Sequence, residues 1–316
     1  MWRLALLGVL ALATAGEAQG YPWPVKPFHQ RHLIGGTFGD PRMIFKRRLE
    51  NGGITGPGRF YFHNGVDIHA PPGTPVYPIL SGVAHRVNRT AVVVSFPGRP
   101  SFQYWHLKLA VRTGQPVVAQ KTVLGRIAVW SNHVHLTELD EGHTVNPLAP
   151  GHLAPYRDWT RPRVREIDFR DARGKPMSPL GVHGRIDVFA DAYDLPVPVA
   201  GLSLALPVTP AVVSWRLTTL AGRVVRRTQT PVDFRFSELP SHAFWRTYGR
   251  GTYPNGPIFG NQLYKKMPGR YLFRLTPYGL DTRRLADGIY VITVTARDIR
   301  GNRAALRQSF EVRNRS

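Results

Sequence analysis

The sequence contains no cysteine among its 316 residues. This absence excludes thiolate zinc sites, iron–sulfur clusters, disulfide frameworks and cysteine nucleophiles. Any metal site in this chain must therefore use histidine, aspartate or glutamate as its ligands. Twelve histidines are available for that purpose.

Acidic residues are also scarce, with 20 Asp and Glu against 42 Lys and Arg, which gives a formal net charge of +22. Such a surplus of positive charge favours polyanionic partners. Nucleic acid, an anionic membrane surface and an acidic cell-wall polymer all have the required chemistry.

The N-terminal apolar run, Leu4 to Ala13, is too short to cross a bilayer. It follows Arg3 and precedes small residues of the kind found at a cleavage site, which predicts a signal peptide over residues 1–18. We therefore expect an exported protein of the periplasm, the cell envelope or the extracellular space, with no membrane span after cleavage. Export disfavours nucleic acid and favours the wall polymer as the partner.

Long amphipathic helices are not expected, because 31 Gly and 28 Pro interrupt the chain too often. Short β-branched and aromatic runs predict strands instead, and Gly301-Asn302 predicts a hairpin turn. The sequence therefore indicates an all-β fold. The predicted strands are residues 76–79, 90–96, 102–106, 123–129, 184–192, 211–217, 232–236, 288–296 and 304–312.

A proline-rich segment, Pro147 to Arg163, breaks the strand pattern and predicts a boundary between domains of residues 19–155 and 156–316. The second domain carries a long insertion near residues 240–280 in which aromatic and basic residues alternate. This stretch either packs its aromatic rings inward or forms a surface that binds sugars or polyanions.

Two histidine motifs are the candidates for chemistry. His63 and Asp67 lie four residues apart, and His133 and His135 lie two apart, so each pair can point to one side of a strand. Imidazole and carboxylate are suitable ligands for Zn²⁺. Each motif alone is weak, since a surface histidine, a turn aspartate or a cross-strand polar pair would give the same pattern.

The motifs around these histidines resemble, in order and spacing, those of the lysostaphin-like (LytM-type) zinc metallopeptidases. The resemblance covers residues 34–148. The segments that carry it are Gly36–Arg42, His63–Ile68, Pro72–Tyr77, Ser81–Val83, Tyr104–Leu107, Gly114–Val117, His133–Glu138 and Asn146–Leu148.

The resemblance implies a compact antiparallel β domain with a narrow groove, and hydrolysis of peptide bonds in the stem peptides or cross-bridges of bacterial peptidoglycan. It implies that His63, Asp67 and His135 hold Zn²⁺ and that His106 and His133 are the catalytic histidines that do not bind metal. All five positions are filled. The alternative is a catalytically silent protein that keeps a zinc site and binds the wall or activates other wall hydrolases.

The resemblance also bears on residues near the groove. It implies that Tyr104 lines the groove, whereas we expect Asn64 to be a turn residue and His69 and His85 to be structural or surface residues. Before His133 the chain lacks the small-residue loop of the family and carries Trp130, which bears on substrate specificity.

The C-terminal region is similar, over its last strands only, to bacterial immunoglobulin-like modules. The likeness rests on Ala286–Tyr290 and Asp298–Asn302. It implies an immunoglobulin-like β-sandwich as an accessory domain, with a role in binding, spacing or partner docking. The basic surface of the protein as a whole is expected to contact anionic wall polymers.

Overall fold

The computed structural model describes residues 20–44, 47–48, 54–55, 59–197, 206–255, 258–259, 262–263 and 269–314. The predicted signal peptide lies outside the described residues. Within them the chain is almost entirely β, with one short helix, α1 (Phe244–Thr247), and two 3-10 turns, η1 (Ser241–Ala243) and η2 (Thr282–Arg284). The predicted all-β fold class is confirmed. No helix in this described part is long and apolar enough to cross a membrane.

The N-terminal half is built around an eight-stranded antiparallel sheet in the order β1-β6-β14-β10-β9-β8-β12, with β15 paired to β14. A three-stranded sheet, β11-β13-β7, packs with it around one hydrophobic core that includes Trp23, Tyr104 and Leu136. The strands are β1 (Ile34–Gly36), β6 (Val66–His69), β7 (Pro75–Val76), β8 (Gly82–Asn88), β9 (Ala91–Ser95), β10 (Ser101–Trp105), β11 (Leu107–Leu109), β12 (Gln115–Val117), β13 (Gly125–Ile127), β14 (His133–Asp140) and β15 (His143–Val145).

The C-terminal half consists of a five-stranded and a four-stranded antiparallel sheet that enclose a second core. Their orders are β17-β16-β18-β23, with β24 paired to β18, and β20-β19-β25-β26. The strands are β16 (Arg163–Asp171), β17 (Pro176–Met177), β18 (Arg185–Tyr193), β19 (Val212–Thr219), β20 (Val224–Asp233), β23 (Leu272–Arg274), β24 (Leu280–Asp281), β25 (Gly288–Arg297) and β26 (Arg303–Val312).

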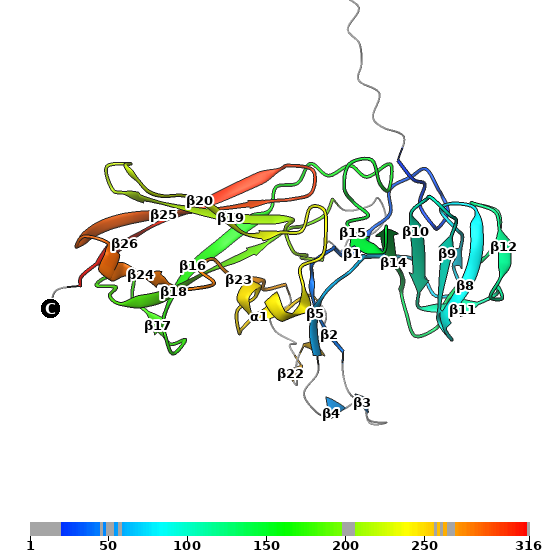
Figure 1. The fold of residues 1–316 in the computed structure, drawn as a ribbon, viewed down its shortest axis with the longest axis horizontal. Helices are drawn as coiled ribbons and strands as arrows, with labels where there is room; N and C mark the ends of the chain where they lie inside the picture. Colours follow the sequence, from blue (N-terminus) through cyan, green and yellow to red (C-terminus); the bar gives the residue numbers. More distant parts are fainter. Residues whose placement is uncertain are drawn as a thin grey trace, which may run out of the picture.

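Short strand pairs lie between these two bodies, where Figure 1 shows β2 and β5 beside α1. Phe38 and Phe62 come from the N-terminal half but belong to the C-terminal core, so the two halves share packing. The remaining pairs are β2 (Pro41–Ile44) with β5 (Arg59–Phe62), β3 (Arg47–Arg48) with β4 (Ile54–Thr55) and β21 (Ile258–Phe259) with β22 (Gln262–Leu263).

Several strand predictions are confirmed and one is wrong in position. The hairpin at Gly301-Asn302 joins β25 and β26 in continuous register from Gly288 to Val312. The strand expected at 232–236 is instead β20, which begins at Val224 and ends at Asp233. β20 is an edge strand whose first residues are mostly exposed. Its sequence is therefore largely polar and lacks the run of apolar residues from which a strand is predicted.

The aromatic stretch near residues 240–280 packs most of its described rings inward. Phe244, Tyr248, Tyr271 and Phe273 are buried members of the C-terminal core. This agrees with the expectation of inward packing over these residues. Trp245 and Tyr278 are exceptions, because 41% and 76% of them are exposed.

Candidate metal centre

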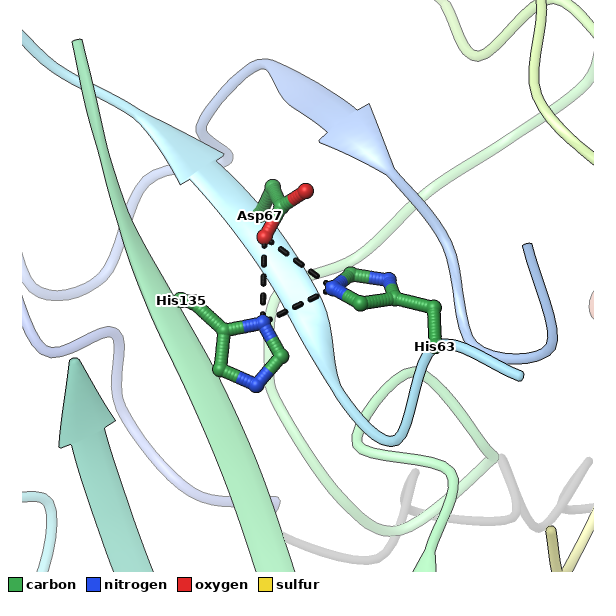
Figure 2. A group of neighbouring side chains, drawn as sticks. All are labelled: His63, Asp67 and His135. Atoms are coloured by element: carbon green, nitrogen blue, oxygen red, sulfur yellow. Dashed lines mark hydrogen bonds and ion pairs between the residues drawn. The ribbon is translucent and has the colours of Figure 1, made fainter. Parts of the chain in front are cut away.

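Three predicted ligands lie together where strands β6 and β14 pair. Asp67 is opposite His135 in the register of these strands, and His63 lies just after β5. Figure 2 shows the three side chains converging, and His63 Nε2, Asp67 Oδ1 and His135 Nδ1 form a triangle with sides of 2.7, 3.1 and 3.1 Å. These donor atoms all lie within 4.8 Å of one another.

The turn between His63 and Asp67 needs glycine at Gly65. A Cβ there would lie 2.2 Å from the carbonyl oxygen of Leu136 in β14. The absence of a side chain therefore lets the turn approach β14 closely enough for His63 to reach His135.

Each ligand side chain is held by a neighbour. The Nδ1–H of His63 donates to the carbonyl oxygen of Thr37 at 2.8 Å, and His135 Nε2 lies 2.9 Å from Thr137 Oγ1. Arg42 donates from Nη2 to Asp67 Oδ2 at 2.9 Å. The Thr37 carbonyl can only accept, so it places the proton of His63 on Nδ1, and all three contacts set how these side chains are turned.

These contacts make the donor set suitable for a divalent cation. When His63 donates from Nδ1 and His135 donates from Nε2 to Thr137, their facing nitrogens carry lone pairs. These two nitrogens lie 2.7 Å apart, and each lies 3.1 Å from Asp67 Oδ1. Because no proton lies between these three atoms, their lone pairs repel one another unless a cation is bound among them. Two neutral imidazoles and one carboxylate are ligands that Zn²⁺ takes in catalytic sites.

The protonation states agree with this interpretation. Burial lowers the pKa of His63 to about 3, so its imidazole is neutral at pH 7. The Arg42 guanidinium lies 2.9 Å from Asp67 Oδ2, and this positive partner favours the ionised form of the carboxylate. The set therefore offers one negative charge and two neutral donors.

The two predicted catalytic histidines border the same centre. His133 Nε2 lies 3.6 Å from Asp67 Oδ1, while its Nδ1 lies 3.1 Å from Asn132 Oδ1. The His106 ring lies 4.8 Å from the His133 ring and 5.2 Å from that of Trp130. Burial lowers the pKa of His133, and burial with His133 and His135 lowers that of His106 to about 4.

His106 reaches the centre through an unusual backbone conformation. It lies between β10 and β11, where the chain passes from the eight-stranded to the three-stranded sheet, and its φ is 70°. A non-glycine residue in this left-handed region costs on the order of 1–2 kcal/mol. In this conformation the His106 ring lies beside that of His133.

A cavity of about 580 Å³ opens over this cluster. Trp105 lines it and Tyr104 does not, so the expectation for Tyr104 is wrong. Tyr104 is fully buried, and its hydroxyl accepts a hydrogen bond from the Ile79 amide at 2.8 Å. Neighbours in a strand face opposite sides, so only Trp105 faces the cavity. The lining residues are Arg42, Tyr61, His63, Asn64, Asp67, Trp105, His106, His133 and His135.

Other histidine and asparagine expectations have mixed outcomes. Asn64, expected to be a turn residue, lines the cavity beside His63. His69 lies opposite His133 in the strand register with rings 6.0 Å apart, yet it does not line the cavity. His85 is exposed on β8, away from the cluster.

The sequence did not indicate how the C-terminal half supports this centre. Arg42, which holds Asp67, also contacts Asp40, and Asp40 Oδ1 accepts a hydrogen bond from the Thr209 amide at 2.7 Å. The Tyr248 hydroxyl donates to the carbonyl oxygen of Gly39 at 2.8 Å. Segment 35–42 therefore links the cluster to the second core.

No protein-family model and no curated protein matches this chain. Among solved structures, a chain of the SpoIIQ–SpoIIIAH pore-forming complex is similar with 21% identity and a TM-score of 0.32, covering 42% of this chain and 90% of its own. A zinc-containing peptidase from Vibrio cholerae has 24% identity and a TM-score of 0.29, with 41% of this chain and 39% of that chain covered.

The catalytic domain of EnpA, a prophage-encoded M23 protein from Enterococcus faecalis, has 25% identity and a TM-score of 0.25, covering 35% of this chain and 88% of its own. These TM-scores all lie below 0.5. They do not assign the chain to a family, and its function must be argued from the site itself.

Proposed function

We propose that this protein is an exported zinc-dependent endopeptidase that hydrolyses peptide bonds in bacterial peptidoglycan. The observation that carries the proposal is the triangle of lone-pair donors formed by His63, Asp67 and His135, with two further histidines at the edge of one cavity. The motif resemblance to lysostaphin-like peptidases over residues 34–148 supports the choice of substrate.

His63, Asp67 and His135 would hold the zinc ion, and Arg42 and Thr37 keep two of them turned toward it. When bound, zinc would polarise a carbonyl group and lower the pKa of coordinated water toward about 7. Three protein ligands leave positions open for water and substrate, which is typical of catalytic rather than structural zinc.

His133 and His106 supply the proton transfers. Because His133 Nδ1 faces Asn132 Oδ1, its Nε2 carries a lone pair beside the ligands and can accept a proton from water. The water oxygen adds to the carbonyl carbon, the C–N bond breaks, and the proton held by His133 passes to the leaving amine. His106 is neutral at pH 7, and its N–H can stabilise charge that develops on the carbonyl oxygen. We therefore propose His133 as the general base and His106 as the oxyanion donor.

We further propose that the basic surface holds the enzyme on anionic wall polymers. Cleavage after residue 18 would remove one Arg and one Glu, so the mature chain keeps its +22 charge. Electrostatic retention of this kind weakens as salt rises, because screening shortens the range of the interaction.

The test combines metal analysis with product identification. We expect about one zinc per chain, cleared bands on zymograms of purified walls, and new peptide termini by mass spectrometry of crosslinked muropeptides. Asp67→Ala and His133→Ala should abolish cleavage, whereas His85→Ala, an exposed histidine of the same sheet, should leave it unchanged.

Circular dichroism establishes that each variant folds. Activity equal to wild type in Asp67→Ala or His106→Ala would contradict the proposal. One bound zinc with no peptide released from any muropeptide would instead support the silent alternative, a zinc-site protein that binds walls or activates other hydrolases.

A further inference from the structure

A second cavity, of about 430 Å³, lies in the C-terminal half between the edge strand β20 and the segment that leads from β23 into β24. It shares no lining residue with the cavity over the metal centre. Its volume is within the range of about 300–1,000 Å³ that is common for small-ligand sites. The wall residues are Arg185, Trp215, Arg226, Gln229, Thr230, Pro231, Leu275, Thr276, Pro277, Tyr278, Gly279, Leu280, Asp281 and Arg284.

Three arginines give this cavity its charge. Arg185, Arg226 and Arg284 are exposed, and within the described residues none of them forms an ion pair. The single carboxylate in the wall, Asp281, is already held by Arg283 through bonds of 2.8 and 2.9 Å. The Arg283 side chain lowers the pKa of Asp281 to about 2, so it stays ionised and paired. The wall therefore has three guanidinium groups available to an incoming anion.

Aromatic and neutral polar groups complete the wall. Tyr278 stands at the tip of the turn with 76% of it exposed. That turn passes close to Arg185 because Gly279 has a φ of +75° and no side chain, and a Cβ there would lie 2.7 Å from Arg185 Cγ. Trp215 is 5% exposed, and no described residue accepts a hydrogen bond from its buried indole N–H.

This combination has a definite chemical preference. Guanidinium groups bind carboxylate and phosphate oxygens through paired, charge-assisted hydrogen bonds. An exposed tyrosine ring beside them offers a flat, amphipathic surface, against which the apolar face of a sugar ring can lie. Gln229 and Thr230 add polar groups that can bond to hydroxyls.

We propose that this cavity binds a saccharide that carries an oxyanion, with Arg185, Arg226 and Arg284 engaging a carboxylate or phosphate and Tyr278 packing on the sugar ring. The site requires no zinc and no cleavage. It would give the C-terminal half a ligand of its own, separate from the substrate of the metal centre.

The test uses the full mature chain, with ¹⁵N-labelled tryptophan and three probes. These are trigalacturonic acid for the carboxylate form, glucose 6-phosphate for the phosphate form, and maltotriose as the neutral control. The indole N–H signal that disappears in Trp215→Phe identifies Trp215. We expect this signal to shift with one or both anionic probes and not with maltotriose. The anionic probe that shifts it shows whether the site accepts a carboxylate, a phosphate or both.

Calorimetry with the binding probe then tests the residues. Arg226→Gln and Arg284→Gln should each weaken affinity about tenfold or more, in line with loss of about 1.4 kcal/mol. Arg216→Gln is the matched control, because Arg216 is an exposed neighbour of Trp215 in β19 that does not line the cavity. Tyr278→Ala should weaken binding of the saccharide but not of inorganic phosphate.

Three results would overturn the proposal. The first is absence of any Trp215 shift with both anionic probes, and the second is an equal loss of affinity in Arg216→Gln, which would mean diffuse charge attraction. The third is inorganic phosphate binding as tightly as the sugar anions, which would leave an anion site without a saccharide. None of these results depends on whether the metal centre cleaves peptides.

Discussion

At the scale of single residues, the predicted ligands of the candidate metal centre owe their orientation to neighbouring residues outside the predicted ligand set. Thr37 sets the tautomer of His63 through its carbonyl oxygen, and Arg42 takes up the second oxygen of Asp67. Contacts of this kind commonly change metal affinity by 10–100-fold when they are lost. They are the first place where the zinc proposal can be tested without touching a ligand.

Replacing Arg42 by Met should weaken zinc binding by about 10–100-fold, because Asp67 loses the donor that orients it. Arg42→Lys keeps the positive charge but loses the planar guanidinium group. The zinc affinity of this variant should therefore lie between those of wild type and Arg42→Met. Competition with a chromogenic chelator measures the dissociation constant. The control is Arg59→Met, an exposed arginine of β5. A zinc affinity in Arg42→Met equal to wild type would show that Arg42 does not orient the site.

The φ of 70° at His106 gives a second prediction. His106→Gly and His106→Ala should both lose the proposed peptidase activity, but the glycine variant should be more stable by about 1 kcal/mol, because glycine adopts this conformation without strain. Urea unfolding measures the difference. At the exposed Lys108 in β11, the alanine variant should instead be more stable than the glycine variant, since glycine weakens an ordinary strand. The same order at both positions would count against strain at His106.

At the scale of elements, the segment that contains β1 and the start of β2 connects the two halves of the molecule. The Gly39 amide donates to the His63 carbonyl, and the Asp40 carbonyl accepts from the His63 amide, both at 2.8 Å. On its other side this segment meets Thr209, Phe234 and Tyr248 of the C-terminal half. The C-terminal half is therefore part of the support of the metal centre.

Gly39→Ala should disturb this connection strongly. Gly39 has a φ of +87°, and a Cβ there would lie 2.3 Å from the Phe234 ring. We expect the free energy of unfolding to fall by roughly 1–2 kcal/mol because of backbone strain and by a further amount of about 1–3 kcal/mol because of overpacking. Thermal unfolding and chelator competition measure stability and zinc affinity, and both should fall.

Gly114→Ala is the matched control, because its φ is +81° and nothing lies within 4 Å of the added Cβ. Its free energy of unfolding should fall only by the amount that backbone strain costs, and its zinc affinity should equal that of wild type. Equal losses of stability in the two variants would mean that the packing of Gly39 on Phe234 is unimportant.

At the scale of the whole molecule, three carboxylates meet where the chain passes from the first core to the second. Asp158, Asp194 and Asp298 come from the connecting segment, the end of β18 and the β25–β26 turn, and one oxygen or more of each lies within 4.8 Å of the others. Arg300 lies nearby, over the ring of Tyr156 at 5.1 Å.

Burial, then the neighbouring carboxylates, raise the pKa of Asp194 well above its usual value, and burial raises that of Asp298 to about 6. The folded state therefore holds protons that the unfolded state releases, so stability should fall as pH rises from about 4 to about 6. Asp194→Asn should raise the free energy of unfolding at pH 7 by about 1 kcal/mol, which corresponds to a melting temperature higher by roughly 2–4 °C. At pH 4 the same substitution should change the melting temperature little.

Asp140→Asn, an exposed carboxylate in β14, is the control for this prediction and should show no such pH-dependent gain. Calorimetric scans at pH 4 and pH 7 distinguish the two variants. If Asp194→Asn destabilised the protein at pH 7, repulsion among the three carboxylates would not be a feature of the fold.

The sequence by itself predicted the all-β class and, through the motif resemblance, the five histidine and aspartate positions that the structure brings to one cavity. The fold class follows because frequent glycine and proline rule out long helices. The site positions follow because the order and spacing of motifs can be compared along one chain without knowledge of the fold. It also predicted the β25–β26 hairpin, because a Gly-Asn turn between alternating residues specifies its own register.

Only the tertiary structure decided which neighbours of those positions matter. Trp105 rather than Tyr104 faces the cavity because the register with β14 sets the side of the sheet, and a run of aromatic residues does not reveal that side. The link from Asp67 through Arg42 and Asp40 to Thr209 joins residues far apart in the chain. Such contacts follow from the packing of two cores, which is a long-range property that local patterns do not encode.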